Sequence, residues 1–102
     1  MTEWTKKEYD AQAATGVTVI DFWAPWCAPC RMMATPFAAV AEQMQDKARF
    51  VKVNVDENEE LANMFRISAI PTVAVVKDGV VKEVSVGLLN EQALLDLVTR
   101  NL

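Results

Sequence analysis

Histidine is absent from this sequence of 102 residues, and cysteine occurs only twice, as Cys27 and Cys30. Two cysteines in one tight pair cannot cross-link a framework, which excludes a small disulfide-rich secreted scaffold. A zinc site would need two further Cys or His ligands, and the sequence has none. The pair therefore points to redox chemistry, with two structural free thiols as the alternative.

Long apolar segments and an excess of positive charge are also missing. The 10 Lys and Arg residues are outnumbered by 14 Asp and Glu, which gives a net charge of −4. This balance disfavours nucleic acid and anionic membranes as partners. No signal peptide or membrane span is visible, so we expect a cytoplasmic protein. With 52% hydrophobic residues, the chain suits a single domain over residues 1–102, which we expect to be monomeric.

Hydrophobic periodicity in the first two thirds of the sequence predicts strands that alternate with helices. The expected strands are 17–23 and 49–56, and the expected helices are 31–45 and 57–66. Pro36 lies too deep in the first of these helices to be a start residue and should kink it. This alternation is typical of a parallel sheet with crossover helices.

The last third of the sequence follows a different pattern. Two β-rich segments, 72–77 and 80–86, flank Asp78-Gly79. This dipeptide is a strong hairpin signal, so the last two strands should be antiparallel. Asn90 is a good N-cap for a final helix with an apolar stripe.

The two cysteines lie where a predicted strand hands over to a predicted helix. Free backbone N–H groups and the helix dipole favour negative charge there, so a thiolate would be stabilised. Cys27 and Cys30 are three apart, so a helical first turn places them on one side, where they can close a disulfide. Pro29 suits a first turn because its missing N–H would have no helical partner.

Asp21 is unexpected inside an apolar strand. It is either a surface carboxylate on an edge strand or a buried acid whose pKa is raised by desolvation. Lys52 likewise lies in the middle of a predicted strand.

Residues 16–102 resemble the thioredoxin family. The resemblance is carried, in order, by Asp21-Phe22-Trp23-Ala24, Trp26-Cys27-Ala28-Pro29-Cys30, Pro36, Lys52, Asn54-Val55-Asp56, Ile70-Pro71-Thr72, Asp78-Gly79 and Gly87. It implies an α/β fold with a central mixed five-stranded sheet flanked by four helices. The implied activity is reduction of protein disulfides, with a Cys27–Cys30 redox-active disulfide and no bound cofactor. NADPH would supply the electrons indirectly, through a thioredoxin reductase.

The resemblance also implies the roles of individual residues. Cys27 should attack the substrate disulfide and Cys30 should resolve the mixed disulfide. Asp21 and Lys52 would move protons to and from Cys30 as a coupled pair. Pro71 would be cis and face the dithiol, and the backbone before it would pair with an extended substrate segment. The expected contact surface comprises Trp26, Ala28, Pro29, Ala69, Ile70, Pro71 and Gly87.

Two departures from the family pattern replace glycine by alanine, at Ala28 between the cysteines and at Ala69 shortly before Pro71. Ala28 should shift the redox potential, in a direction that we leave open. Residues 1–15 match the pattern poorly. The alternatives are a specialised relative that serves one partner, a glutathione-fed glutaredoxin, and a non-catalytic binding or chaperone module of the same fold.

Overall fold

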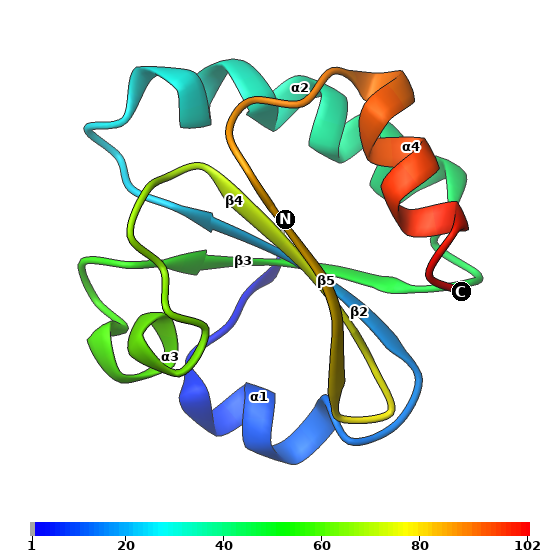
Figure 1. The fold of residues 1–102 in the computed structure, drawn as a ribbon, viewed down its shortest axis with the longest axis horizontal. Coiled ribbons are helices and arrows are strands. Elements are labelled where there is room, and N and C mark those ends of the chain that lie inside the picture. Colours follow the sequence, from blue (N-terminus) through cyan, green and yellow to red (C-terminus); the bar gives the residue numbers. More distant parts are fainter. Residues whose placement is uncertain (1) are drawn as a thin grey trace.

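Five strands form one mixed sheet in a computed structural model of the chain, which describes residues 2–102 (Figure 1). Their spatial order is β1-β3-β2-β4-β5. β1, β3 and β2 run parallel, whereas β4 and β5 are each antiparallel to the preceding neighbour. β2, which leads into the cysteine pair, is therefore central. The strands are β1 (Thr2–Glu3), β2 (Val17–Trp23), β3 (Arg49–Asn54), β4 (Thr72–Lys77) and β5 (Val80–Val86).

Among residues 2–102, four helices cover the two faces of the sheet. α2 and α4 lie on one face, and α1 and α3 lie on the other (Figure 1). The expected mixed five-stranded sheet with four helices is thus confirmed. Within residues 2–102, every helix is too short or too polar to span a bilayer. The helices are α1 (Lys6–Gln12), α2 (Ala28–Gln43), α3 (Glu59–Met64) and α4 (Glu91–Thr99).

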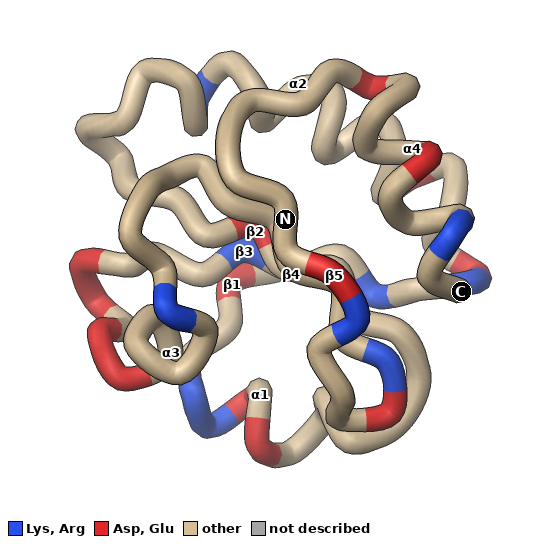
Figure 2. Tube along the Cα trace, in the orientation of Figure 1, with Lys and Arg blue, Asp and Glu red and all other residues tan. Residues whose placement is uncertain are grey.

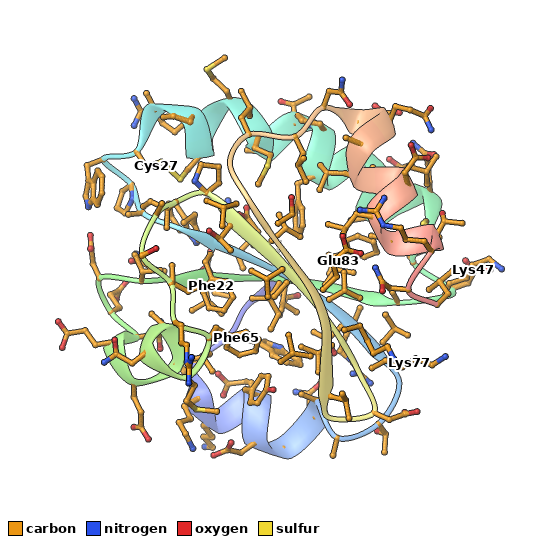
Figure 3. All side chains as sticks on the ribbon, viewed as in Figure 1. Phe22, Cys27, Lys47, Phe65, Lys77 and Glu83 are labelled. Atoms are coloured by element: carbon orange, nitrogen blue, oxygen red, sulfur yellow. A yellow bond between two sulfur atoms is a disulfide. The ribbon has the colours of Figure 1, made fainter. Side chains whose placement is uncertain are left out.

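Each face of the sheet has its own hydrophobic core, because successive residues of a strand point to opposite faces. Val19 of β2 packs under α2 and α4 against Phe37 and Leu97. Phe22 of β2 packs on the other side, and its ring centroid lies 5.0 Å from that of Phe65 (Figure 3). Both faces of β2 are therefore buried, which fits its largely apolar sequence.

The observed bounds differ from the expected ones in three elements, and α2 also ends at Gln43 instead of residue 45. α2 begins at Ala28, three residues earlier than expected, because Cys27 supplies its N-cap. β3 ends at Asn54 because the side-chain oxygen of Asn54 accepts a hydrogen bond from the Asp56 N–H, 2.9 Å away, which turns the chain. α3 is shorter than 57–66 and is followed by Arg66 in a left-handed conformation, with φ +55°.

The β4–β5 hairpin has the turn that its Asp78-Gly79 dipeptide predicts, with positive φ at both residues. The turn is also tied to the start of β2. The Asp78 N–H donates to the Gly16 carbonyl over 2.9 Å, and the Gly16 N–H donates to Asp78 Oδ1 over 2.8 Å. These bonds fix the hairpin against the end of β2 that is remote from the cysteines.

Candidate active site

The cysteine pair forms the start of α2. Cys27 is the N-cap residue, and its Sγ accepts a hydrogen bond from the Cys30 N–H over 3.2 Å. The two sulfurs are joined in a disulfide, with the Cα atoms 5.2 Å apart. Sulfur here takes the place of the oxygen acceptor that usually caps a helix. A negative charge on Cys27 Sγ would thus face a backbone N–H and the positive end of the α2 dipole.

The turn before the disulfide is held by its own hydrogen bonds. The Cys27 N–H donates to the Ala24 carbonyl over 3.1 Å, and Arg31 Nη1 donates to the Pro25 carbonyl over 2.8 Å. Ala24 is fully buried beside the two cysteines, which are themselves only 4% and 2% exposed. Substrate access is therefore confined to a narrow part of the disulfide.

Ala28 and Pro29 are exposed and form the first turn of α2. Pro29 fits there as expected, because the first N–H groups of a helix have no internal acceptor. Ala28 and Pro29 separate the two cysteines in the chain and are open to solvent.

The segment before β4 lies on the other side of the disulfide. Ile70–Pro71 is cis, and Ile70 packs against the cluster of Ala24 and the two cysteines. Pro71 itself is buried, and its carbonyl accepts a hydrogen bond from the Gly87 N–H over 2.8 Å. Ala69 is exposed. Residues predicted from two distant parts of the sequence thus meet at one place.

A shallow, mainly apolar pocket of about 450 Å³ adjoins this segment. The Trp26 indole, 67% exposed, forms one wall, and its Nε1 donates to Asp56 Oδ2 over 2.8 Å. This bond holds the ring over the pocket instead of letting it rotate freely. The pocket is lined by Trp26, Val55, Ala62, Ile67, Ser68, Ala69 and Ile70.

Asp21 and Lys52 are direct neighbours across β2 and β3. Asp21 is fully buried, and within the described residues neither of its carboxylate oxygens has a hydrogen-bond partner. Burial raises the pKa of Asp21 from 3.8 to about 6, Lys52 acts against this rise, and Glu3 adds to it. The Lys52 ammonium lies 4.4 Å from the centre of the Trp23 ring. Asp21 can therefore exchange a proton near neutral pH.

Sequence reasoning missed several residues of this site. Asp56 opens an acidic segment, 56–60, whose composition is typical of a solvated turn, but it holds the Trp26 ring from 30 positions further along the chain. Trp23 ends an apolar strand but is only half-buried, and its ring contacts Glu3 and Lys52. Arg31 carried no signal for its bond to Pro25. Such contacts join side chains from separate elements and leave no local periodicity.

Side chains that could ligate a metal ion are dispersed over the described part of the chain. Over residues 2–102, no three His, Cys, Asp or Glu side chains gather closely enough to hold a metal ion.

Comparisons with known proteins agree with this geometry. The thioredoxin family model matches residues 1–100. A thioredoxin of Bacillus subtilis (strain 168) is 44% identical over 98 residues, which cover 96% of this chain and 94% of that protein. Thioredoxin 1 of Synechococcus elongatus is 40% identical over 84 residues, covering 82% of this chain and 78% of that protein.

A solved structure of Plasmodium falciparum thioredoxin superimposes on the whole chain. Its TM-score is 0.91 at 29% sequence identity, and the match covers 100% of both chains. The fold, the cysteine pair at the start of α2 and the sequence matches all point the same way. The chain belongs to the thioredoxin family, and its activity is that of a protein disulfide oxidoreductase with Cys27–Cys30 as the redox-active disulfide.

Proposed function

We propose that the chain acts as a single domain that takes electrons from an NADPH-linked thioredoxin reductase and passes them to disulfides of cytoplasmic proteins. The observation that carries the proposal is the N-cap hydrogen bond from the Cys30 N–H to Cys27 Sγ. It supports Cys27 as the sulfur that the helix start would stabilise in ionised form, and so as the proposed attacking group.

The exchange starts from the reduced protein. The Cys27 thiolate attacks one sulfur of the substrate disulfide, forms a mixed disulfide and releases the other substrate sulfur as a thiolate. Cys30 then loses its proton and attacks Cys27 Sγ, which closes the Cys27–Cys30 disulfide and releases the second substrate sulfur. Two electrons have passed from the protein to the substrate. The reductase would return two electrons and reopen the disulfide.

Asp21 is the group proposed to accept the Cys30 proton, with Lys52 beside it to stabilise the carboxylate. A base works best when its pKa lies near the ambient pH, and the pKa of Asp21 is about 6. An ordinary surface aspartate would be a weaker base. Burial of Asp21 therefore supports the role that the family resemblance implies.

The substrate surface is proposed to comprise the exposed residues around the disulfide. Trp26 and the adjoining apolar pocket offer contact to apolar side chains, and the exposed Ala28 and Pro29 lie between the two cysteines in the chain. The backbone at Ala69 and Ile70 would pair with an extended substrate segment, and Gly87 lies beside Pro71. Such a shallow surface suits flexible protein segments of varied sequence.

Cysteine variants test the proposal. Cys27→Ser and Cys30→Ser, alone and together, should abolish reduction of insulin disulfides by NADPH and a purified thioredoxin reductase, since each removes one partner of the exchange. Cys30→Ser should also accumulate a mixed disulfide at Cys27, detectable by mass spectrometry. Ser differs from Cys by one atom, so the fold should persist by circular dichroism. Unchanged biological function in the double variant would favour a non-catalytic binding module.

Asp21→Asn tests whether Asp21 acts in only one of the two steps, the first attack by Cys27 or the resolution by Cys30. Single-turnover kinetics should show a resolution step that is at least about tenfold slower, because general-base catalysis typically contributes that much or more. The first attack by Cys27 should keep its rate. Equal effects on both steps would rule out the proton-acceptor role.

A further inference from the structure

Three charged residues lie side by side across the sheet. Glu3 of β1 pairs in register with Lys52 of β3, and Lys52 pairs in register with Asp21 of β2. Residues in register across neighbouring strands project to the same face. Lys52 thus has a carboxylate on each side, which Figure 2 shows as adjacent red, blue and red segments on β1, β3 and β2.

Glu3 and Lys52 also contact the same aromatic ring, that of Trp23. Trp23 Nε1 donates a hydrogen bond to Glu3 Oε1 over 3.3 Å, and the Lys52 ammonium lies 4.4 Å from the centre of the same ring. A cation is attracted to the face of an indole. The position of the Trp23 ring therefore helps to set the position of the ammonium, and Glu3 holds that ring.

Among residues 2–102, the other side chains that pack around Asp21 are apolar. Its partner on β4 is Val73, and α2 and α4 cover this face with apolar side chains such as Met33 and Leu94. Lys52 on β3 and Glu3 on β1 are the charged groups that act on Asp21, and the cysteines at the start of α2 are joined as a disulfide. Burial is the largest cause of the raised pKa of Asp21, and the charges that then modify this pKa are the Lys52 ammonium, which lowers it, and the more distant Glu3 carboxylate, which raises it.

We propose that Glu3 is a positioning residue for the exchange reaction: it draws the Lys52 ammonium away from Asp21 and holds the Trp23 ring against which that ammonium rests. The inference rests on the proton-acceptor role proposed for Asp21. With Glu3 present, Lys52 stabilises the Asp21 carboxylate less. Asp21 thereby stays a stronger base at neutral pH, which favours removal of the Cys30 proton.

Glu3→Gln tests the charge with little change in shape, because the Gln side-chain oxygen can still accept the Trp23 Nε1–H bond. Carbon-13 NMR of the side-chain carboxyls of the oxidised protein would follow the titration of Asp21. Glu3 and Asp21 are about two strand spacings, or roughly 10 Å, apart. The pKa of Asp21 should therefore fall by roughly half a pH unit in Glu3→Gln. Glu3→Lys should lower it further.

The kinetic readout is the pH dependence of the resolution step. In Glu3→Gln, the acid limb of that profile should shift to lower pH by the same amount as the pKa of Asp21. The pH profile of the first attack should not shift. Glu59→Gln is the matched control, since it removes an exposed negative charge on α3 that is not among the charges acting on Asp21. Its Asp21 titration and both profiles should equal those of the unmodified protein.

Two results would overturn the proposal. An Asp21 midpoint that is the same in Glu3→Gln and Glu59→Gln would show that Glu3 does not act on Asp21. A shifted midpoint with an unmoved acid limb would show that the coupling has no part in the reaction. The NMR titration needs no activity, so failure of the Glu3 proposal is distinguishable from failure of the Asp21 role, which Asp21→Asn tests by itself.

Discussion

Asp21 is a carboxyl group held in an environment that opposes its ionisation. It is fully buried and, over residues 2–102, no hydrogen bond reaches either oxygen. A buried polar group without partners normally lowers the stability of a fold. Packing does not account for its presence in the central strand, whereas the proton-acceptor role proposed for Asp21 would.

This burial makes the stability of the protein depend on pH. The pKa of Asp21 is 3.8 ordinarily and about 6 in the fold. Between these values the folded state binds more protons than the unfolded state, so the free energy of unfolding falls as pH rises from about 4 to about 6 and is then constant. The loss amounts to about 3 kcal/mol, since one pKa unit corresponds to about 1.4 kcal/mol.

Asp21→Asn should remove this pH-dependent fall in the free energy of unfolding. Relative to the unmodified protein, the variant should gain about 3 kcal/mol between pH 4 and pH 7, measured by urea unfolding across that range. Asp46→Asn, at an exposed position, should follow the unmodified protein. Parallel curves for Asp21→Asn and the unmodified protein would contradict a raised pKa.

At the residue scale, the sequence drew attention to residues whose type is out of place, but it could not predict contacts that only geometry decides. Cys27, Cys30 and Asp21 stand out by type in their segments. Met32 and Met33 are the same residue type, but Met33 is buried and Met32 is 65% exposed, because adjacent helical residues point about 100° apart. The contact between Glu3 and Trp23 joins β1 and β2, and no local pattern predicts it.

Among the elements, α2 shows how a functional side chain can define a boundary. The apolar periodicity of residues 31–45 predicted the body of the helix, but it carried no information on the cap. Cysteine is not among the usual N-cap residues, so the start at Ala28 could not be derived from capping preferences. The same sulfur both ends the preceding turn and carries the exchange chemistry.

β1 is a strand that the sequence pattern did not predict. It has two residues, Thr2 and Glu3, and a period-2 pattern needs more than that to be recognised. The strand became visible only through its pairing with Val51 and Lys52 of β3. In contrast, β4 and β5 were predicted at their observed bounds because the Asp78-Gly79 turn separates two clear β segments.

α4 has a conventional cap, whose contribution can be measured. Asn90 Oδ1 accepts a hydrogen bond from the Ala93 N–H over 2.8 Å. Asn90→Ala removes this acceptor and should lower the free energy of unfolding by about 1 kcal/mol in urea titrations. Asn90→Asp keeps an acceptor and should stay within about 0.5 kcal/mol of the unmodified protein. Equal losses in both variants would mean that the cap bond does not stabilise α4.

For the whole molecule, the alternation of strands and helices predicted an α/β protein with parallel pairing, and β1, β3 and β2 do run parallel. The strand order β1-β3-β2-β4-β5 could not be predicted in the same way. Periodicity shows which face of a strand is buried but not which strand lies beside it, so the sheet with four helices came from the family resemblance. The two-faced core then follows from the alternation of side chains along β2.

The redox state should change the stability of the whole fold. The disulfide closes a ring of four residues, because its cysteines are three apart in sequence. Restricting the unfolded chain in this way stabilises the oxidised form by on the order of 2 kcal/mol. Urea unfolding with and without a reductant should show the difference. The Cys27→Ser, Cys30→Ser double variant should show none, and a reduced form as stable as the oxidised form would contradict the expectation.

The bonds between Gly16 and Asp78 place the β4–β5 turn at the opposite end of the sheet from the disulfide (Figure 3). Lys77 is in register with Val17 at the start of β2, and β2 then runs for seven residues, roughly 20 Å, toward the cysteines. A bead, an electrode or a fluorescent reporter attached at the exposed Val80 would thus leave the sulfurs facing solution. The geometry of the sheet makes this turn the natural anchoring point for an immobilised, rechargeable form of the protein.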